Sequence, residues 1–204
     1  TTSNNYPYAA RISLRDATAD SVNSQFTASP LSAGNITYIR NAVKATVDAY
    51  DGTVTIYAWD EADPILQTWS KAFPGVVQPK SAIPAGVLEH IRYPEDMFKV
   101  QRNVLSRYHV TDPQAFYSGQ DFWIVPEDPT KPTVGQPQPP YFLTLQMPDQ
   151  EAPSFSLTST FAPTNRQTLA AFMSVNADAG DDYGTIRVLQ LPRNTTIPGP
   201  RQVQ

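Results

Sequence analysis

Apolar and polar positions recur with different periods in the two halves of the chain. In the first half, apolar residues recur at spacings of three and four over residues 36–50 and again over 94–109, which predicts two amphipathic helices. Shorter helices are predicted over 64–73 and 84–90, each opened by a proline that suits a first helical turn. Residues 53–59 alternate between faces and predict a strand that follows the first helix.

The second half carries the pattern of strands. Apolar residues alternate, or run continuously, over five short segments. These are Phe122–Val125, Tyr141–Met147, Ser154–Phe161, Leu169–Val175 and Thr185–Leu191. Helices mainly in the first half, followed by an antiparallel β meander, predict an α+β fold. We expect one domain over residues 1–204, or two lobes, with mixed helix and strand over 1–112 and mainly β structure over 113–204.

The helix over 94–109 is the most clearly marked element. Pro94 suits its first turn, and Glu95 and Asp96 complement the positive end of the helix dipole. Its apolar stripe is expected to face the core, and its cationic side chains are expected to face water. The stripe consists of Met97, Val100, Val104, Leu105 and Tyr108, and the cationic residues are Lys99, Arg102 and Arg107.

Composition and charge exclude several classes of protein. The net charge is −4, and no cluster of Lys or Arg supplies the cationic surface that nucleic acids or anionic lipids require. The chain has no Cys, which excludes disulfides and thiolate chemistry. Charged residues make up 17% of the chain, below the roughly 25% that is typical of soluble domains, which favours an exported protein. No apolar run is long enough to span a membrane, and the polar N-terminus is unlike a signal peptide, so an export signal would lie upstream.

Several long segments resemble one protein family. They are RYPEDMFKVQR at 92–102, YHVTDP at 108–113, FYS at 116–118, DFW at 121–123, YFLTLQMP at 141–148 and PGPRQVQ at 198–204. In these segments the chain resembles the uncharacterised protein family 0182, large multi-pass bacterial membrane proteins of actinobacteria. The resemblance extends from Tyr6 to the end. It implies part of an extracytoplasmic soluble region, on the outer face of the cytoplasmic membrane, and it implies no activity and no catalytic residue.

A tight acidic cluster precedes the predicted helix over 64–73. Asp60, Glu61 and Asp63 are placed to cap free backbone amides at the start of that helix. The alternative is a cation site or one half of a carboxylate pair for hydrolysis, which requires a second carboxylate across a cleft. The second reading makes these three residues candidate binding residues.

A second group of carboxylates lies in the loop over 176–184. Asp178, Asp181 and Asp182 offer oxygen ligands on a short loop, as calcium prefers, although the bidentate Glu of an EF-hand is missing. Asp, Asn and Gly are also ordinary residues of hairpin loops. Calcium is therefore the one cofactor that we consider. Gly-rich loops that would hold a nucleotide are absent from the sequence.

Aromatic and imidazole side chains supply the remaining candidates. Tyr117 and Trp123 lie in an aromatic-rich region beside a proline-rich loop and are candidates for binding a glycan or a partner protein; core packing is the alternative. His90 and His109 fall at the ends of predicted helices, where an imidazole interacts favourably with the helix dipole.

These observations favour a non-enzymatic extracytoplasmic interaction module of a multi-pass membrane protein. Its expected partners are the transmembrane block of the parent protein and components of the cell envelope. The alternatives are a hydrolase that cleaves envelope polymers with carboxylates, and a domain that senses a small ligand.

Overall fold

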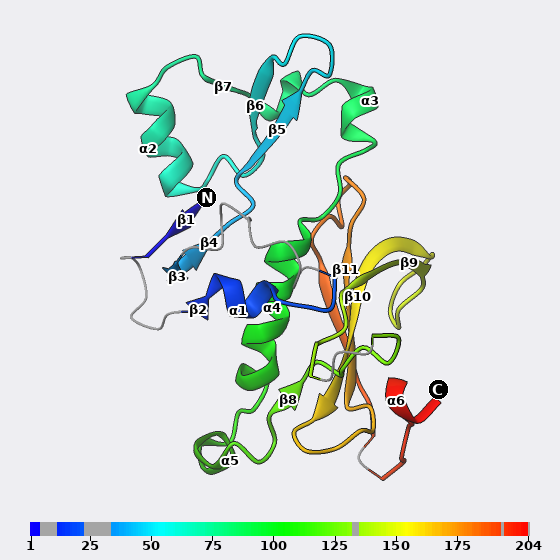
Figure 1. Cartoon of the computed structure of the whole chain (residues 1–204). Coiled ribbons are helices and arrows are strands. Elements are labelled where there is room, and N and C mark those ends of the chain that lie inside the picture. The colour runs from blue at the N-terminus through cyan, green and yellow to red at the C-terminus, as the bar shows by residue number, and fades with distance from the viewer. Residues whose placement is uncertain (5–11, 23–33, 132–134, 193, 204) are drawn as a thin grey trace. The chain divides into compact units, whose positions relative to one another are not determined.

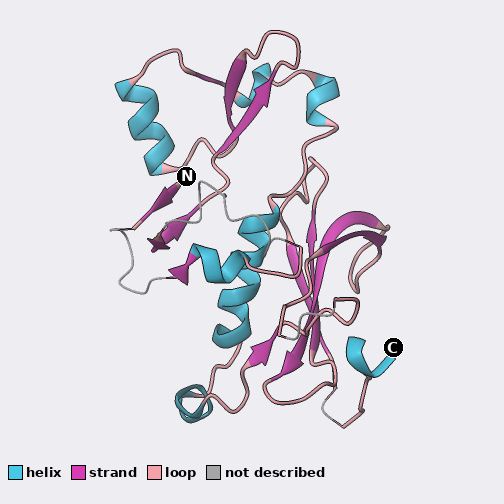
Figure 2. Ribbon diagram, in the orientation of Figure 1, coloured by secondary structure: helices cyan, strands magenta, loops and turns pink. Residues whose placement is uncertain are grey.

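The chain is described by a computed structural model over residues 1–4, 12–22, 34–131, 135–192 and 194–203 (Figure 1). It forms two compact units. Unit 1 consists of Thr1–Ser13 and Gly34–Ile91, and unit 2 consists of Leu14–Ala33 and Arg92–Gln204. Helices and strands both occur, and the second half is an antiparallel sheet, which confirms the α+β prediction (Figure 2). The motif Tyr6-Pro7-Tyr8 lies outside the described residues.

The described residues of unit 1 form short strands and three short helices. Its elements are β1 (Thr2–Ser3), β2 (Ile12–Ser13), β3 (Asn35–Ile36), β4 (Tyr38–Ile39), β5 (Val43–Val47), β6 (Val54–Ala58), α2 (Pro64–Ala72), β7 (Val77–Gln78), the 3-10 helix η2 (Lys80–Ala82) and α3 (Ala85–Leu88). β5 pairs with β6 antiparallel, and β6 pairs with β7 parallel. A small core of Ala42, Ala58 and Leu66 lies where α2 meets this sheet.

The helix predicted over residues 36–50 is wrong. The segment forms β3, β4 and β5 instead. Its residues are rich in β-branched Ile, Val and Thr, which suit a pleated strand better than a helix, and this preference outweighs the coincidental spacing of three and four. Asp51-Gly52 therefore belongs to the hairpin turn between β5 and β6, where Gly52 adopts a φ of 77°.

The other predictions for unit 1 are confirmed at the level of elements, with one change in burial. The strand over 53–59 is β6, and the helices over 64–73 and 84–90 are α2 and α3. In α2, however, only Leu66 is buried. Trp69 and Phe73 stack on each other at 5.5 Å and are 58% and 54% exposed. The sequence predicts that both face the core.

Unit 2 packs one long helix against a curved antiparallel sheet (Figure 1). Its elements are α1 (Leu14–Thr18), α4 (Glu95–Tyr108), α5 (Pro113–Ser118), β8 (Trp123–Ile124), β9 (Tyr141–Leu145), β10 (Ser154–Pro163), β11 (Ala171–Asn176), β12 (Ile186–Gln190) and α6 (Pro200–Val203). The strand order is β12-β11-β10-β8, and β9 pairs with the other part of β10. All five predicted strands are present; α1, α5 and α6 were not predicted.

The core of unit 2 lies between α4 and one face of the sheet. Phe98 of α4 and Leu157, Phe161 and Val175 of the sheet are fully buried there. Successive side chains of a strand point to opposite faces, so Leu157, Ser159 and Phe161 of β10 share one face, and Ser156, Thr158 and Thr160 share the other. Ser156 and Thr158 are also buried. β10 therefore has buried side chains on both faces, and those on the second face include hydroxyl residues.

The prediction that the cationic residues of α4 face water is wrong for two of them. Lys99 is 0% exposed and Arg102 is 2% exposed. α4 packs against the sheet on one side and against α1 on another, so little of its circumference is free. Burying these charges requires partners, because an isolated buried cation is strongly unfavourable.

Candidate functional site

The acidic cluster before α2 is divided among different contacts within unit 1. Asp60 forms an ion pair with Arg40 at 2.8 Å, and its Oδ1 also accepts a hydrogen bond from the N–H of Ala62. Glu61 is exposed. Asp63, in contrast, is 0% exposed. The three residues are neighbours in sequence, but their carboxylates have separate environments.

Asp63 is the N-cap of α2 and the polar centre of unit 1. Its Oδ1 accepts from the N–H of Leu66 at 2.7 Å, and its Oδ2 accepts from the hydroxyls of Tyr38 at 2.5 Å and Thr1 at 3.1 Å. Burial alone would raise the pKa of Asp63. The hydrogen bonds from Tyr38, Leu66 and Thr1 stabilise the ionised form and together outweigh this effect, so the pKa lies below its usual value. An ionised carboxylate held by three donors is suited to fixing the backbone at this point.

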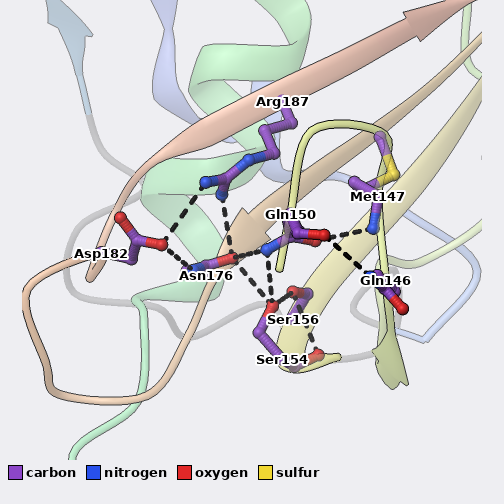
Figure 3. A network of polar contacts seen from close by, with 8 residues as sticks. All are labelled: Gln146, Met147, Gln150, Ser154, Ser156, Asn176, Asp182 and Arg187. Carbon is purple, nitrogen blue, oxygen red and sulfur yellow. Dashed lines mark hydrogen bonds and ion pairs between the residues drawn. The ribbon is translucent and has the colours of Figure 1, made fainter. Parts of the chain in front are cut away.

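The acidic loop over 176–184 joins a polar network at the end of β11 (Figure 3). Asn176 is its centre: the side-chain oxygen accepts from Gln150, Ser154 and Arg187 at 3.0–3.3 Å. Asp182 accepts from the Nδ2 of Asn176 at 3.5 Å and pairs with Arg187 at 3.4 Å. The network ties the β9–β10 turn to the β11–β12 loop.

The other two carboxylates of the predicted calcium loop lie apart from this network. Asp178 is paired with Arg92 at 3.3 Å, and Asp181 is exposed. Within the described ranges, no three His, Asp or Glu side chains lie close enough together to hold a metal ion. Calcium binding at Asp178, Asp181 and Asp182 stays a prediction.

The two aromatic candidates differ in exposure. Tyr117 projects from α5 and is 96% exposed. Trp123 is 9% exposed and stacks on the imidazole of His109, with ring centroids 3.5 Å apart. His109 also lies between two backbone carbonyls, with Nδ1 2.8 Å from the oxygen of Leu105 and Nε2 3.0 Å from that of Asp121. These contacts tie the end of α4 to the segment before β8. His90 contacts the carbonyl of Gly86 within unit 1.

Sequence reasoning missed a buried ion network on α4. Lys99 Nζ lies 2.5 Å from Asp20 and 2.7 Å from Glu95, and the side chains of Lys99 and Asp20 are both 0% exposed. Nearby, burial lowers the pKa of Arg102 to about 10, and its guanidinium donates to Ser159 and to the carbonyl of Gln138. Asp20 is distant from α4 in sequence, so no local pattern could have identified the pair.

A cavity of about 630 Å³ lies in unit 2 beside the end of β12. Its lining is rich in amide and hydroxyl side chains and includes Gln120, Trp123, Gln167, Thr168, Gln190 and Gln202. Asp121 and Arg166 are the charged members of the lining. Such a surface offers many neutral hydrogen-bonding groups and few groups that could transfer a proton.

Two of the outer strands of the unit 2 sheet, β9 and β12, carry exposed apolar side chains on both faces. On β9, Tyr141, Phe142 and Leu143 are 40–47% exposed, and on β12, Ile186, Val188 and Leu189 are 37–40% exposed. Strands that are apolar on both faces are typical of the covered interior of a sheet. The consecutive apolar residues of β9 and β12 are visible in the sequence. They indicate a strand that is apolar on both faces, but they do not indicate where that strand lies in the sheet.

The fold and these contacts define a class: a two-unit α+β chain with apolar sheet edges and a buried ion pair between Lys99 and Asp20. Within the described residues, no helix combines the length and apolar character needed to span a membrane. The chain belongs to the uncharacterised protein family UPF0182, whose model matches residues 1–204. The resemblance found in the sequence is thereby confirmed.

Relatives within this family are much longer than the chain. A UPF0182 protein of Thermobifida fusca is 56% identical over 206 residues, which include all of this chain and 20% of the relative. UPF0182 proteins of Streptomyces coelicolor and Kineococcus radiotolerans are 55% and 52% identical and are covered to 21% and 22%. The chain thus spans about a fifth of the length of these relatives. No solved structure matches it.

Proposed function

We propose that this chain is a non-enzymatic interaction module of a larger multi-pass membrane protein, positioned on the outer face of the bacterial cytoplasmic membrane. The observation that carries the proposal is the exposed apolar surface on β9 and β12 of the unit 2 sheet. Exposed apolar side chains on a sheet edge favour association, because leaving apolar surface in water costs about 25 cal/mol per Å². The partner is the remainder of the parent polypeptide, with cell-envelope components as further partners.

Association with the remainder of the parent is tested by expressing the protein as two polypeptides. The 204-residue chain is produced separately from the rest of the parent, and the two are purified together through a tag on one. Co-purification at a defined ratio is expected. Phe142→Glu on β9 should weaken it at least about tenfold, the effect of ~1.4 kcal/mol.

Val54→Glu is the matched control for that variant. Val54 is 58% exposed on the β5–β6 hairpin of unit 1, so the change places the same charge on an exposed apolar strand residue elsewhere. Co-purification should survive it. Failure of the wild-type pieces to associate, or equal losses in both variants, would refute the assignment of the contact to the sheet edges.

The location is tested separately, with one engineered thiol. The chain has no Cys, and Tyr50 is fully exposed on the β5–β6 turn. Tyr50→Cys in the full-length parent, with other accessible thiols removed, should react in intact cells with a maleimide that cannot cross the membrane. Labelling only after the cells are lysed would place the chain on the cytoplasmic side.

A ligand-sensing role is a second candidate, favoured by the amide- and hydroxyl-lined cavity beside Trp123. Neutral hydroxylated ligands such as saccharides match that lining, because each hydroxyl can both donate and accept. A ligand that binds the folded state raises the midpoint of thermal unfolding. A saturable rise with a neutral sugar, abolished by Gln167→Leu, is the expected result, and an unchanged midpoint across the sugars tested would remove this candidate.

A further inference from the structure

The outer edge of β12 presents main-chain groups that pair with no strand among the described residues, and their direction follows from the hydrogen bonds of the sheet. In an antiparallel pair, residues that exchange hydrogen bonds alternate with residues whose N–H and C=O point away. The N–H of Leu191 donates to the carbonyl of Ala170, and the N–H of Asn176 donates to the carbonyl of Thr185. Both hydrogen bonds show that the odd-numbered residues of β12 are the ones that bond to β11.

That alternation directs Thr185, Arg187, Leu189 and Leu191 toward β11. The main chains of Ile186, Val188 and Gln190 then point outward. β12 is the last strand in the order β12-β11-β10-β8, so within the described part of the chain no strand pairs with these outward groups. Three donors and three acceptors are arranged as a template for another strand.

The side chains along this edge are also those of an interior strand. Ile186 and Val188 lie opposite Val175 and Met173, which belong to the core between the sheet and α4. The apolar layer of unit 2 therefore continues to the edge, where Ile186 is 37% and Val188 is 40% exposed. Proteins usually protect such edges with charges, prolines or short strands, and the outward positions of β12 carry none of the charges or prolines.

From this edge we infer that β12 receives an added β-strand from another part of the full-length polypeptide. This inference rests on the proposed function and specifies its mode of contact. The relatives are about five times as long as the chain, since it covers 20–22% of each, so the parent has ample sequence to supply the strand. The incoming strand carries apolar residues at the alternate positions that meet Ile186 and Val188.

A second copy of the chain fits this edge less well. Antiparallel self-pairing centred on Val188 places Ile186 opposite Gln190 and Arg187 opposite Leu189. Self-pairing centred on Arg187 places two guanidinium groups opposite each other, and like charges in that position are destabilising. A strand from elsewhere in the parent avoids both mismatches.

Residue-resolved hydrogen exchange in the full-length protein and in the 204-residue chain tests the inference. The amides of Ile186, Val188 and Gln190 should exchange rapidly in the separate chain and at least about tenfold more slowly in the full-length protein. The amides of Arg187 and Leu189, which face β11, are the internal control and should be protected in both. Rapid exchange of the three outward amides in both proteins would overturn strand addition, as would protection in the separate chain that grows with its concentration.

A pair of variants separates main-chain pairing from apolar contact. Val188→Pro removes one outward N–H, which an edge strand tolerates, and Val188→Thr keeps that N–H and the β-branched shape. In the two-polypeptide assay, Val188→Pro should reduce association at least about tenfold, and Val188→Thr should reduce it less than about threefold. Retained protection of Leu189 shows that the proline variant is folded. Association that survives Val188→Pro while Phe142→Glu abolishes it would preserve the interaction module and refute strand addition.

Discussion

The two units solve the burial of charge in different ways. In unit 1, the buried carboxylate of Asp63 is surrounded by neutral donors, two hydroxyls and one backbone N–H. In unit 2, the buried carboxylate of Asp20 faces the buried ammonium of Lys99. A carboxylate held by neutral donors can lose one of them and keep the rest. Each member of a buried ion pair depends on the other, because the remaining charge would be left without compensation.

The units also differ in how much apolar core supports these groups. Among the described residues of unit 1, the cluster around Leu66 has three buried side chains, with Val43 and Val77 packed against it. The unit 2 core around Phe98 and Phe161 extends along α4 and the sheet. Unit 2 can therefore retain a costly ion pair, whereas the short elements of unit 1 depend more on caps and hydrogen bonds. The following predictions test this difference.

The largest effect is expected from Lys99→Met. The substitution leaves Asp20 buried without its cation and should lower the free energy of unfolding of unit 2 by about 3–5 kcal/mol. Urea denaturation, followed by exchange of a core amide such as Val175, measures it. Unit 1, followed at Ala58, should be affected much less.

Two further variants examine the cause of that loss. Lys99→Met combined with Asp20→Leu removes both charges and should recover most of the stability, because an apolar pair of similar size replaces the ion pair. Lys71→Met on the exposed side of α2 changes the same residue types at a surface position and should stay within about 0.5 kcal/mol. A double variant as unstable as Lys99→Met would show that the ion pair is not the cause.

The second effect concerns how the C-terminal segment is held against unit 2. Ile197 accepts a hydrogen bond from the N–H of Leu169, and Pro198 forms a bridge with Thr168. A Cβ on Gly199 would overlap the carbonyl oxygen of Gln167, so Gly199→Ala should cost about 1–3 kcal/mol through forced displacement of this segment.

Gly180→Ala is the matched control for Gly199→Ala. A Cβ at Gly180 meets nothing within 4 Å, and its φ is not positive. The midpoint of thermal unfolding of Gly180→Ala should be unchanged or slightly raised. Hydrogen exchange of the Leu169 amide should accelerate in Gly199→Ala alone. Equal midpoints for the two variants would show that residues 197–199 contribute little to unit 2.

The sequence predicted the elements of unit 2 better than those of unit 1 for a physical reason. α4 is long, amphipathic and marked by Pro94, and the strands after residue 120 run apolar over strand-like lengths, so local pattern and tertiary packing agree. Over residues 36–50 the apolar residues fit both the period of a helix and that of a strand. The β-branched residues and the pairing of β5 with β6 favour strands.

The site residues were predicted less well, because their roles depend on contacts that are distant in sequence. The capping role of Asp63 could be predicted from Pro64 and the helix that follows. The hydrogen bond that it accepts from Tyr38 could not be predicted from the sequence. Burial of Lys99 depends on Asp20, which reaches α4 through the segment that begins at α1. Local sequence patterns can therefore predict helix caps, whereas a buried ion pair between distant residues is identified only from the three-dimensional structure.

The third prediction concerns the carboxylate of Asp63, which caps α2 in unit 1. Asp63→Ala removes the N-cap of α2 and the acceptor for Tyr38 and should destabilise unit 1 by about 1–2 kcal/mol at pH 7. Because the folded-state pKa of Asp63 lies below its unfolded value of about 3.9, its contribution is present above that pH and is lost as the pH falls through the folded value. The difference between wild type and Asp63→Ala should therefore be constant from pH 5 to 7 and shrink below about pH 4. A difference that grows in acid would contradict the assignment.

The smallest effect is expected at Asp60, three residues away in the same acidic cluster. Asp60 pairs with Arg40 at the surface of unit 1, where the two side chains are 28% and 47% exposed. Exposed pairs contribute about 0.2–1 kcal/mol, and salt screens them. A double-mutant cycle of Asp60→Asn and Arg40→Gln should give a coupling energy in this range that falls further in 1 M salt. Because Asp63 is buried and held by hydrogen bonds to neutral donors, the loss in Asp63→Ala should keep most of its size in the same salt. If both losses were equally sensitive to salt, the environments of the two carboxylates would not differ as the structure describes.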